Sequence, residues 1–371
     1  MNSSTSIAYI HSEKASRFAD LLPKNQYRSS LCFQLIDSYQ LFNQIHLFNP
    51  TKATREDLLE YHSSDYVDFL LKYSYGKQDE IGQEEMEEYG LTEDCFAFDG
   101  ITEYILWVAG GSLTAARTLM KNQFDVVINV DGGRHHSLKD EAKGFCYVND
   151  IVLALTLLRE KFERILYLDI DIHHGDAVES AFSHSNKVTT VSFHQYLPGF
   201  FPGTGSIKDI GFGKGMYHTI NVPLLPGLSG ETFQKVYNSV LTELMDNNNF
   251  DCIVMQCGMD GLAKDPLGGW NLGIRDISNA IHTTVQYNLP TLLLGGGGYN
   301  NANVARCWAY TLSELVNQTP DNNIPEHAEW LAYSPDFVLH VPISRVKDEN
   351  VDEYIQEVLN EIVENIRKMN N

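Results

Sequence analysis

Residues 169–176 read Asp-Ile-Asp-Ile-His-His-Gly-Asp, a dense set of groups that can bind a metal or transfer a proton. The run continues an apolar stretch, and the alternation of a strand would turn Asp169, Asp171 and His173 to one side and the isoleucines into the core. A single acidic or imidazole group at a strand end is often only a solvent-facing cap. Two carboxylates and an imidazole without a thiol suit a divalent ion such as zinc, held in an open catalytic site by three protein ligands.

One ligand of such a site has to come from another segment of the chain. Asp260, in the sequence GMDG at residues 258–261, is the best candidate because it follows another apolar run. The neighbouring glycines permit a close approach of the backbone. Taken alone, Asp260 would be interpreted as an ordinary turn aspartate.

Two adjacent histidines, His135 and His136, follow a third apolar run and suggest acid/base catalysis. Adjacent imidazoles seldom both find hydrogen-bond partners in a core unless a polar site supplies them. The alternative is one buried, hydrogen-bonded histidine beside an exposed neighbour. Asp169 and Asp176 can accept hydrogen bonds from the Nδ1 atoms of the two imidazoles and so set their tautomer and basicity. The sequence therefore predicts two His–Asp pairs beside a metal.

Four glycines at residues 295–298 precede Tyr299. This segment lacks the Lys-Ser/Thr pair that completes a phosphate-binding P-loop, and it does not match the GxGxxG fingerprint. A nucleotide-binding protein is therefore disfavoured. Flexible glycines beside a tyrosine better suit the positioning of a phenol.

The elements that must position these groups alternate along the chain. Short apolar runs typical of buried strands are separated by stretches of helical spacing, which predicts a parallel sheet covered by helices on both faces. Each unusual loop directly follows a strand, and in an open parallel sheet the strand ends share one edge, where ligands bind. We expect a single α/β domain, residues 1–371, with five loops converging on one site. The expected strands are residues 125–130, 164–170, 188–193, 252–257 and 291–294, and the expected helices are residues 101–120, 149–162, 231–245, 276–287, 303–315 and 350–369.

The composition excludes several classes of protein. A chain of 371 residues with 43% apolar content is long enough to bury a large core, so disorder is not its main state. Its 49 acidic and 27 basic residues give a net charge of −22, which repels nucleic acids and anionic membranes and attracts basic partners. The six cysteines include no CxxC pair, which argues against a disulfide framework or a cysteine zinc finger. With no signal peptide or membrane segment visible, we expect a soluble protein of the nucleus and/or cytoplasm.

Together these motifs resemble the class I zinc-dependent histone deacetylases, most of all the histone deacetylase eight branch. The similarity extends from Ile7 to the C-terminal helix and rests on GGRHH with GFCYVND, LDIDIHHGDAVE, PGFFPGTG, GMDGLAKDPLGGWNL and GGGGYNNANVARCW, in the family's order. It implies an arginase/deacetylase fold with a mostly parallel sheet of about eight strands. It also implies a hydrolase that removes acetyl or related short acyl groups from lysines of histone tails and other proteins.

The resemblance implies a role for each group already singled out. His136, partnered by Asp176, would be the general base for the attacking water. His135, partnered by Asp169, would supply electrostatic help or the proton for the leaving amine. Tyr299 would donate its hydroxyl to the substrate carbonyl. The implied ligands of zinc, or of an alternative divalent ion such as Fe²⁺, are Asp171, His173 and Asp260.

Further positions follow from the resemblance alone. Asp94 would hydrogen-bond the substrate backbone at the rim, and Arg28 would line an internal exit channel for acetate. The residues implied to form the tunnel for the lysine stem and its mouth are Gly144, Phe145, Phe201, Leu267, Trp270 and Gly297. One structural potassium ion would be held, mainly by backbone carbonyls, by Asp169, Asp171, His173, Ser192 and Phe193, and a second by Phe182, Ser185, Val188 and His218.

The chain departs from the family's usual pattern at several positions. Arg134 stands where Leu or Trp is usual, and residues 137–138 are Ser-Leu in place of the common Ala-Lys, which could reshape the channel beneath the zinc site. The basic positions that bind inositol phosphate in complex-forming members are the uncharged Pro266 and Ala302, so we expect no such effector. A small insertion at residues 24–26, relative to this branch of the family, precedes Arg28.

Two other functions are consistent with parts of this pattern. A deacetylase of small acetylated amines, such as polyamines, would use the same active site and differ at rim residues such as Asp94. A noncatalytic acetyl-lysine-binding or scaffold protein on the same fold is disfavoured because the metal ligands, both histidines and Tyr299 are all retained.

Overall fold

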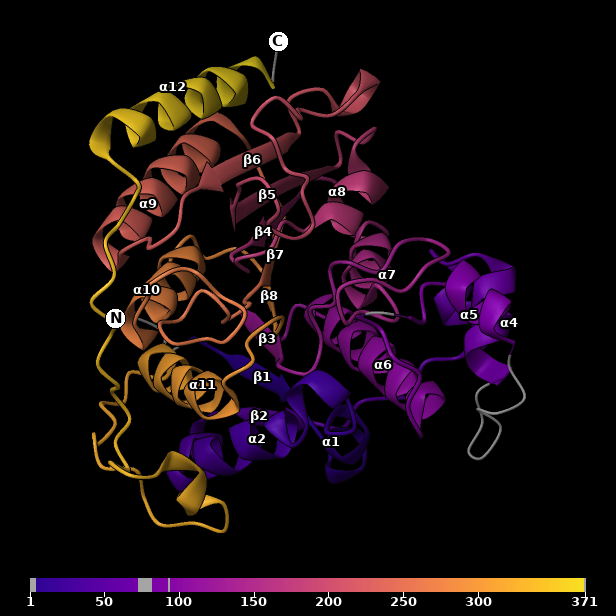
Figure 1. Ribbon diagram of the computed structural model, residues 1–371, viewed down its shortest axis with the longest axis vertical. Coiled ribbons are helices and arrows are strands. Elements are labelled where there is room, and N and C mark those ends of the chain that lie inside the picture. The colour runs from indigo at the N-terminus through magenta and orange to yellow at the C-terminus, as the bar shows by residue number, and fades with distance from the viewer. Residues whose placement is uncertain (1–4, 73–81, 93, 370–371) are drawn as a thin grey trace.

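The structure is a computed structural model that describes residues 5–72, 82–92 and 94–369 (Figure 1). Within these ranges its centre is an eight-stranded sheet in the order β2-β1-β3-β8-β7-β4-β5-β6, and every pair of neighbours is parallel. Parallel neighbours need crossover connections, which are mostly helical here. The strands are β1 (Ile7–Ile10), β2 (His46–Phe48), β3 (Val126–Asn129), β4 (Ile165–Asp169), β5 (Val188–Gln195), β6 (Thr219–Leu224), β7 (Cys252–Gln256) and β8 (Thr291–Leu294).

Helices cover both faces of the sheet (Figure 1). One face packs against α2 (Arg28–Ser38), α9 (Gly230–Asn247), α10 (Ile274–Val285), α11 (Asn301–Leu315) and α12 (Asp352–Lys368), and the other against α6 (Ile101–Leu119), α7 (Asp150–Leu158) and α8 (Asp176–Phe182). The remaining α-helices are α1 (Glu13–Ala19), α3 (Arg55–Leu59), α4 (Ser64–Lys72) and α5 (Gln83–Glu88). Short 3₁₀ turns lie at Pro23–Asn25, Leu41–Gln44, Gly213–Gly215 and Trp330–Tyr333.

The core lies on both sides of the sheet, which explains the continuous apolar strands. In β4, Leu166 and Leu168 pack into the cluster under α9–α12, while Ile165 and Tyr167 pack into the cluster under α6–α8. All four side chains are buried. A parallel sheet covered on both faces requires apolar side chains on both sides of each strand. The apolar runs of the sequence are therefore strands buried on both faces, and not strands with one face exposed to solvent.

The predicted α/β class, with a parallel sheet between two helical layers, is confirmed. All five predicted strands are present within two residues of their expected ends, and β8 matches at both ends. Of the predicted helices, residues 149–162 extend too far, because α7 ends at Leu158. The sequence pattern missed β1, β2 and β6. β1 and β2 are short, β2 is also largely exposed, and β6 contains Pro223.

The arrangement of the strands determines where the site lies. Since all strands are parallel, the loops after β3, β4, β5, β7 and β8 leave the sheet at the same edge, where ligands bind in open α/β sheets.

Among the helices of the described residues, none is both long enough and apolar enough to span a membrane.

Candidate active site

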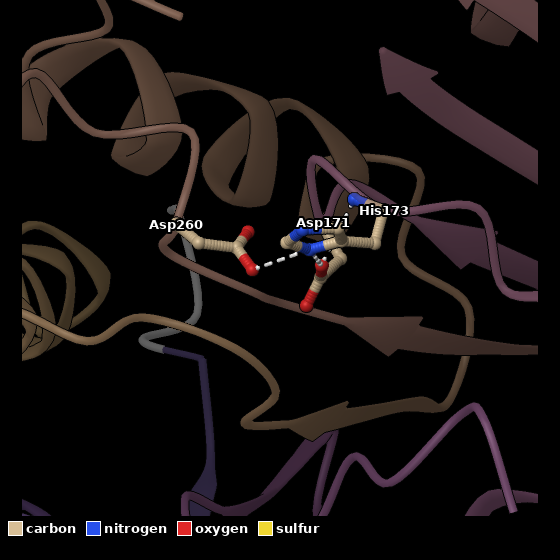
Figure 2. Close-up of side chains that lie close together, drawn as sticks. All are labelled: Asp171, His173 and Asp260. Atoms are coloured by element: carbon tan, nitrogen blue, oxygen red, sulfur yellow. Dashed lines mark hydrogen bonds and ion pairs between the residues drawn. The ribbon is translucent and has the colours of Figure 1, made fainter. Parts of the chain in front are cut away.

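Three side chains of types that commonly bind metals meet at this edge (Figure 2). Asp171 and His173 follow β4 and Asp260 follows β7, and each offers one ligand atom within 4.8 Å of the others. His173 Nδ1 lies 3.0 Å from Asp260 Oδ2 and 3.2 Å from Asp171 Oδ1. Donors about 2.1 Å from a tetrahedral zinc ion are about 3.4 Å apart, so small adjustments would admit the ion. The structure therefore brings together the three residues expected to bind the metal.

The electrostatics of this cluster favour a cation. Burial opposes charge on His173, but the carboxylates of Asp260 and Asp171 outweigh it and raise the pKa of His173 to about 10. Burial, followed by repulsion from Asp171, raises the pKa of Asp260. Two carboxylates thus share a buried space with a single imidazole. A divalent ion would replace the proton on His173 and neutralise both carboxylates.

Surrounding groups hold the two carboxylates in place. Asp171 Oδ2 accepts hydrogen bonds from Gln256 Nε2 and from the backbone N–H of Gly297, both at 2.8 Å. Asp260 Oδ1 accepts from the Ile172 N–H at 2.9 Å. A Cβ atom at Gly297 would lie 2.1 Å from Asp260 Oδ2, so only glycine fits against the cluster. Such supporting hydrogen bonds fix the orientation of metal ligands.

Two His–Asp pairs lie beside the cluster. His135 Nδ1 is 2.8 Å from Asp169 Oδ2, and His136 Nδ1 is 2.7 Å from Asp176 Oδ1. The two imidazole rings are 3.9 Å apart. In each pair the carboxylate accepts a hydrogen bond from Nδ1, so the Nε2 atom of the imidazole stays available for catalysis. His135 Nε2 lies 3.8 Å from Asp171 Oδ2. The predicted partners are therefore within hydrogen-bond distance, and the alternative of a core histidine with an exposed neighbour does not apply because both rings are buried.

The two histidines have opposite pKa shifts. Burial opposes the charge on His135, but Asp169 and Asp171 raise its pKa to about 9. For His136, burial and then repulsion from His135 lower the pKa to about 3, although Asp176 opposes that shift. Neighbouring titratable groups whose pKa values are pushed apart are typical of acid/base sites, where one group accepts a proton and the other carries one. A metal cation nearby would lower both values.

A cavity of about 300 Å³ leads to these groups. His173 stacks on Phe200 with ring centroids 5.2 Å apart, and His136 meets the ring of Phe201 edge-on at 4.9 Å. The cavity is lined by Asp94, His136, Gly144, Phe145, His173, Gly199, Phe200, Phe201, Leu267 and Tyr299. Its aromatic walls and polar floor suit a long apolar stem that ends in a reacting polar group.

Tyr299 lines the cavity and also a smaller adjoining space that Asp171 borders. Its ring meets Phe145 at 5.6 Å, and its backbone N–H donates to Asp265 Oδ2 at 2.7 Å. Burial, followed by the charges of Asp260 and Asp171, raises the pKa of the Tyr299 phenol well above its ordinary value. The hydroxyl is therefore protonated and available as a hydrogen-bond donor.

Other predicted residues occupy different places. Asp94 accepts a hydrogen bond from the Gly144 N–H at 2.8 Å, which joins two segments that line the cavity. Arg28 lies beneath the site and donates to the carbonyls of Gly297 and Gly298 at 3.2 and 3.0 Å. Trp270 was expected at the mouth or lower wall. It is instead buried in the hydrophobic core near Phe233, with 6.4 Å between the ring centroids.

The residues predicted to bind potassium are distributed over two regions. Asp169 and Ser192 are register partners on β4 and β5, near Asp171, His173 and Phe193. At the other end of β5, which begins at Val188, the Ser185 N–H donates to the Phe182 carbonyl at 2.8 Å, and His218 Nδ1 is 2.9 Å from Thr189 Oγ1. Both potassium sites stay predictions.

Sequence reasoning missed several residues of the site. Lys143 pairs with Asp176 at 2.5 Å, Gln256 holds Asp171, and the Tyr167 hydroxyl donates to Asp169 at 2.6 Å. The first two come from distant segments, and no spacing in the chain signals their contacts. Tyr167 lies two residues before Asp169 on the same strand, so the alternation of side chains could have found it.

Comparison with known proteins identifies similar sequences. The family profile of the histone deacetylase domain matches residues 22–315. The chain is 41% identical to Histone deacetylase 8 of Xenopus tropicalis, over 97% of this chain and 98% of that protein. It is 39% identical to Histone deacetylase 8 of Danio rerio, over 98% and 96% of the two chains. It is 40% identical to Histone deacetylase 1 of Homo sapiens, over 94% of this chain and 72% of that protein.

Proposed function

Because this chain belongs to the histone deacetylase family and is therefore a deacetylase of the hydrolase class, we propose that it removes acetyl and related short acyl groups from lysine side chains in a zinc-dependent reaction. One observation carries the proposal. His136, His173 and Tyr299 line one cavity with aromatic walls, and through His173 and His136 they are in direct contact with the Asp171–His173–Asp260 cluster and the two His–Asp pairs. An amide is a poor electrophile, and its hydrolysis needs an activated nucleophile, carbonyl polarisation and a proton for the amine.

The buried cluster of two carboxylates and an imidazole fits a zinc ion, and Asp171, His173 and Asp260 would hold it. When bound, zinc supplies Lewis-acid polarisation of the amide carbonyl and lowers the pKa of a water molecule to about 7. Fe²⁺ is an alternative occupant, since oxygen and nitrogen ligands suit several divalent ions.

The two histidines divide the proton transfers. His136 is neutral, because burial and His135 keep its pKa low, and its Nε2 takes a proton from the attacking water. Asp176 holds the Nδ1 proton of His136 and so keeps Nε2 as the acceptor. His135, held by Asp169 and with its pKa raised to about 9, supplies electrostatic stabilisation or the proton for the leaving amine.

Tyr299 stabilises the oxygen on which negative charge develops. Its protonated hydroxyl donates to the substrate carbonyl at the end of the cavity. Phe145 and Phe201 enclose the four-carbon stem of the acyl-lysine, and Asp94 binds the peptide backbone at the rim. Each group therefore acts at one part of an extended substrate.

The proposed substrates are acetylated histone tails or other proteins with acetyl-lysine. The net charge of −22 favours the capture of basic segments over long distances. The rival substrate class is small acetylated amines. Turnover of an acetylated histone-tail peptide and of an acetylpolyamine, measured side by side, decides between them, and a preference for the polyamine would overturn the protein-substrate proposal.

Further parts of the proposal are supported by family membership alone. They are a single catalytic domain over residues 1–371, one or two structural potassium ions, and action in the nucleus and/or cytoplasm without direct contact with nucleic acid or membranes. Independence from inositol phosphate is supported by the uncharged Pro266 and Ala302.

A further inference from the structure

Arg134 is a buried cation directly before the two active-site histidines. It is 6% exposed, and it lines a small chamber behind the main cavity together with Leu22, Cys146 and Gly296. The free space in this chamber is about 10 Å³, on a scale where one water molecule needs about 10–15 Å³. The chamber therefore has room for about one water-sized group.

The guanidinium of Arg134 lacks the partners that a buried charge requires. Its Nε is buried without a hydrogen-bond partner, and Nη2 makes only a 3.4 Å contact with the Asp131 carbonyl. Within residues 5–72, 82–92 and 94–369, no carboxylate oxygen lies within 4.0 Å of it. Buried charges are ordinarily paired, because an unpaired one is costly.

The nearby acids are engaged elsewhere. Asp131 Oδ2 accepts a hydrogen bond from the Ser29 hydroxyl at 2.9 Å. Asp150 accepts from the Ser112 hydroxyl at 2.5 Å and from the backbone N–H groups of Gly133 and Arg134 at 2.9 and 2.8 Å. Both carboxylates thus accept hydrogen bonds from other donors, and neither accepts one from the Arg134 guanidinium.

A second cation adds to the positive charge beneath the site. Arg28 is buried and donates to the carbonyls of Gly297 and Gly298. Burial, followed by repulsion from Arg134, lowers the pKa of Arg28. Arginine stays charged in proteins, so the two guanidinium groups repel each other, and the carboxylates of Asp131 and Asp150 offset this repulsion from a distance without forming an ion pair with Arg134.

The chamber opens onto the same residues that line the main cavity. His136, Gly144, Phe145 and Tyr299 border both spaces. An acyl group whose carbonyl meets the Tyr299 hydroxyl therefore has its far end next to the chamber that Arg134 lines. An acetyl group ends in a methyl and leaves the guanidinium unpaired.

We propose that Arg134 recognises the carboxylate of short dicarboxylic acyl groups on lysine, malonyl being the smallest, and that this enzyme removes them. The inference rests on the proposed deacylase function and deepens it by naming a substrate class. A carboxylate matches the planar guanidinium through charge-assisted hydrogen bonds. The small chamber excludes long chains.

The reaction is the hydrolysis proposed above, with a different acyl group. The oxygen of water bonds to the acyl carbon, and the C–N bond breaks with its electron pair on nitrogen. One proton of the water goes to the amine, and the second, released as the new carboxylic acid ionises, also ends on the amine at neutral pH. The products are a lysine ammonium group and the malonate dianion, and no further reactant is needed.

The test compares kcat/KM for one peptide bearing acetyl-, malonyl- or isovaleryl-lysine. In isovaleryl, two methyl groups replace the two carboxylate oxygens of malonyl, so shape is matched and charge is removed. The zinc-loaded wild type should prefer malonyl to isovaleryl by at least tenfold. Arg134→Met should reduce this preference by roughly 10- to 100-fold, and Arg134→Lys, which keeps the charge without the planar fork, by less. Arg345→Met, at an exposed position, is the control for the loss of one charge and should leave the preference unchanged.

Binding provides a readout without turnover. In a Tyr299→Phe background, calorimetry should show tighter binding of the malonyl peptide than of the isovaleryl peptide, and Arg134→Met should abolish the difference. A wild type that cleaves acetyl-lysine but shows no malonyl preference would overturn the inference and leave the deacetylase function intact, even if Arg134→Met does not fold. A preference that survives Arg134→Met would also overturn it. Loss of turnover on all three peptides would reject the proposed function itself.

Discussion

The ammonium group of Lys143 forms an ion pair with the carboxylate of Asp176, with 2.5 Å between Nζ and Oδ2. The other oxygen of this carboxylate lies 2.7 Å from His136 Nδ1. Burial opposes the ionisation of Asp176, but His136 and Lys143 together hold its pKa below the ordinary value. The carboxylate of Asp176 therefore interacts with two groups, Lys143 and the proposed general base His136.

Removal of this shared cation should change the pH dependence of activity. In Lys143→Met, Asp176 acts on His136 alone, which favours the imidazolium and raises the pKa of His136. Less neutral base is then present at acid pH, so the acidic limb of kcat/KM should move to higher pH by roughly half a unit to one unit. Lys143→Arg keeps the charge and should keep the profile. An unshifted profile in Lys143→Met would show that Lys143 does not act on the base.

Tyr299→Phe removes only the hydroxyl proposed to stabilise the oxyanion. Loss of one such donor costs about 10²- to 10³-fold in kcat in enzymes that stabilise an oxyanion with hydrogen-bond donors. Zinc content, measured by elemental analysis, should be unchanged, because Tyr299 is not among the metal-binding residues. Wild-type kcat in this variant would contradict the proposed role.

Phe201→Ala opens one aromatic wall of the cavity. Burial of the four methylene groups of a lysine stem is worth about 3 kcal/mol, and the loss of one of two walls removes roughly half of that, or about tenfold in KM. The substitution should raise KM for the acetyl-lysine peptide with a smaller effect on kcat. Phe212→Ala, at a phenylalanine that is 63% exposed elsewhere, is the matched control. Equal effects of both variants on KM would argue against a role of Phe201 in holding the stem.

His62 should make folding stability depend on pH. Its Nε2 accepts from the Asn149 N–H at 3.0 Å, and burial lowers its pKa from 6.5 to about 4. Between these values the unfolded chain binds a proton that the folded chain does not, so stability falls as pH drops through 6.5 toward 4. The contribution is about 2 kcal/mol between pH 7 and pH 5.

Denaturant unfolding at both pH values tests this expectation. His62→Asn should reduce the acid-induced loss of unfolding free energy by about that amount. His46→Asn, at an exposed histidine, should not. If His62→Asn loses as much unfolding free energy between pH 7 and pH 5 as the wild type, another group is responsible for the pH dependence.

The parts of the fold that the sequence predicted are those in which local pattern and burial agree. Residues 291–294 are apolar, buried and followed by glycines, so β8 was predicted with its exact ends. β6 contains Pro223, which lacks a backbone donor and is tolerated because β6 lies at the edge of the sheet. Its position at the edge is a tertiary fact that no local pattern contains.

The same distinction applies to the site. Asp171 and His173 are two residues apart after one strand, so their common side follows from the alternation of side chains. The prediction that Asp260 joins them required the further inference that the carboxyl ends of parallel strands lie at the same edge of the sheet. The ion pair of Lys143 and the unpaired guanidinium of Arg134 depend on how distant loops pack, and only the structure shows them.

The most direct measurement is the metal content of the purified protein, followed together with acetate release from an acetylated histone-tail peptide. The account predicts one tightly held zinc ion per chain, loss of acetate release when a chelator removes it, and recovery when zinc is returned. Asp171→Asn and Asp260→Asn should each weaken zinc binding while Asp265→Asn, a nearby acid outside the cluster, keeps the ion. Undiminished acetate release by fully metal-free protein, or a folded protein that takes up no metal, would contradict the account.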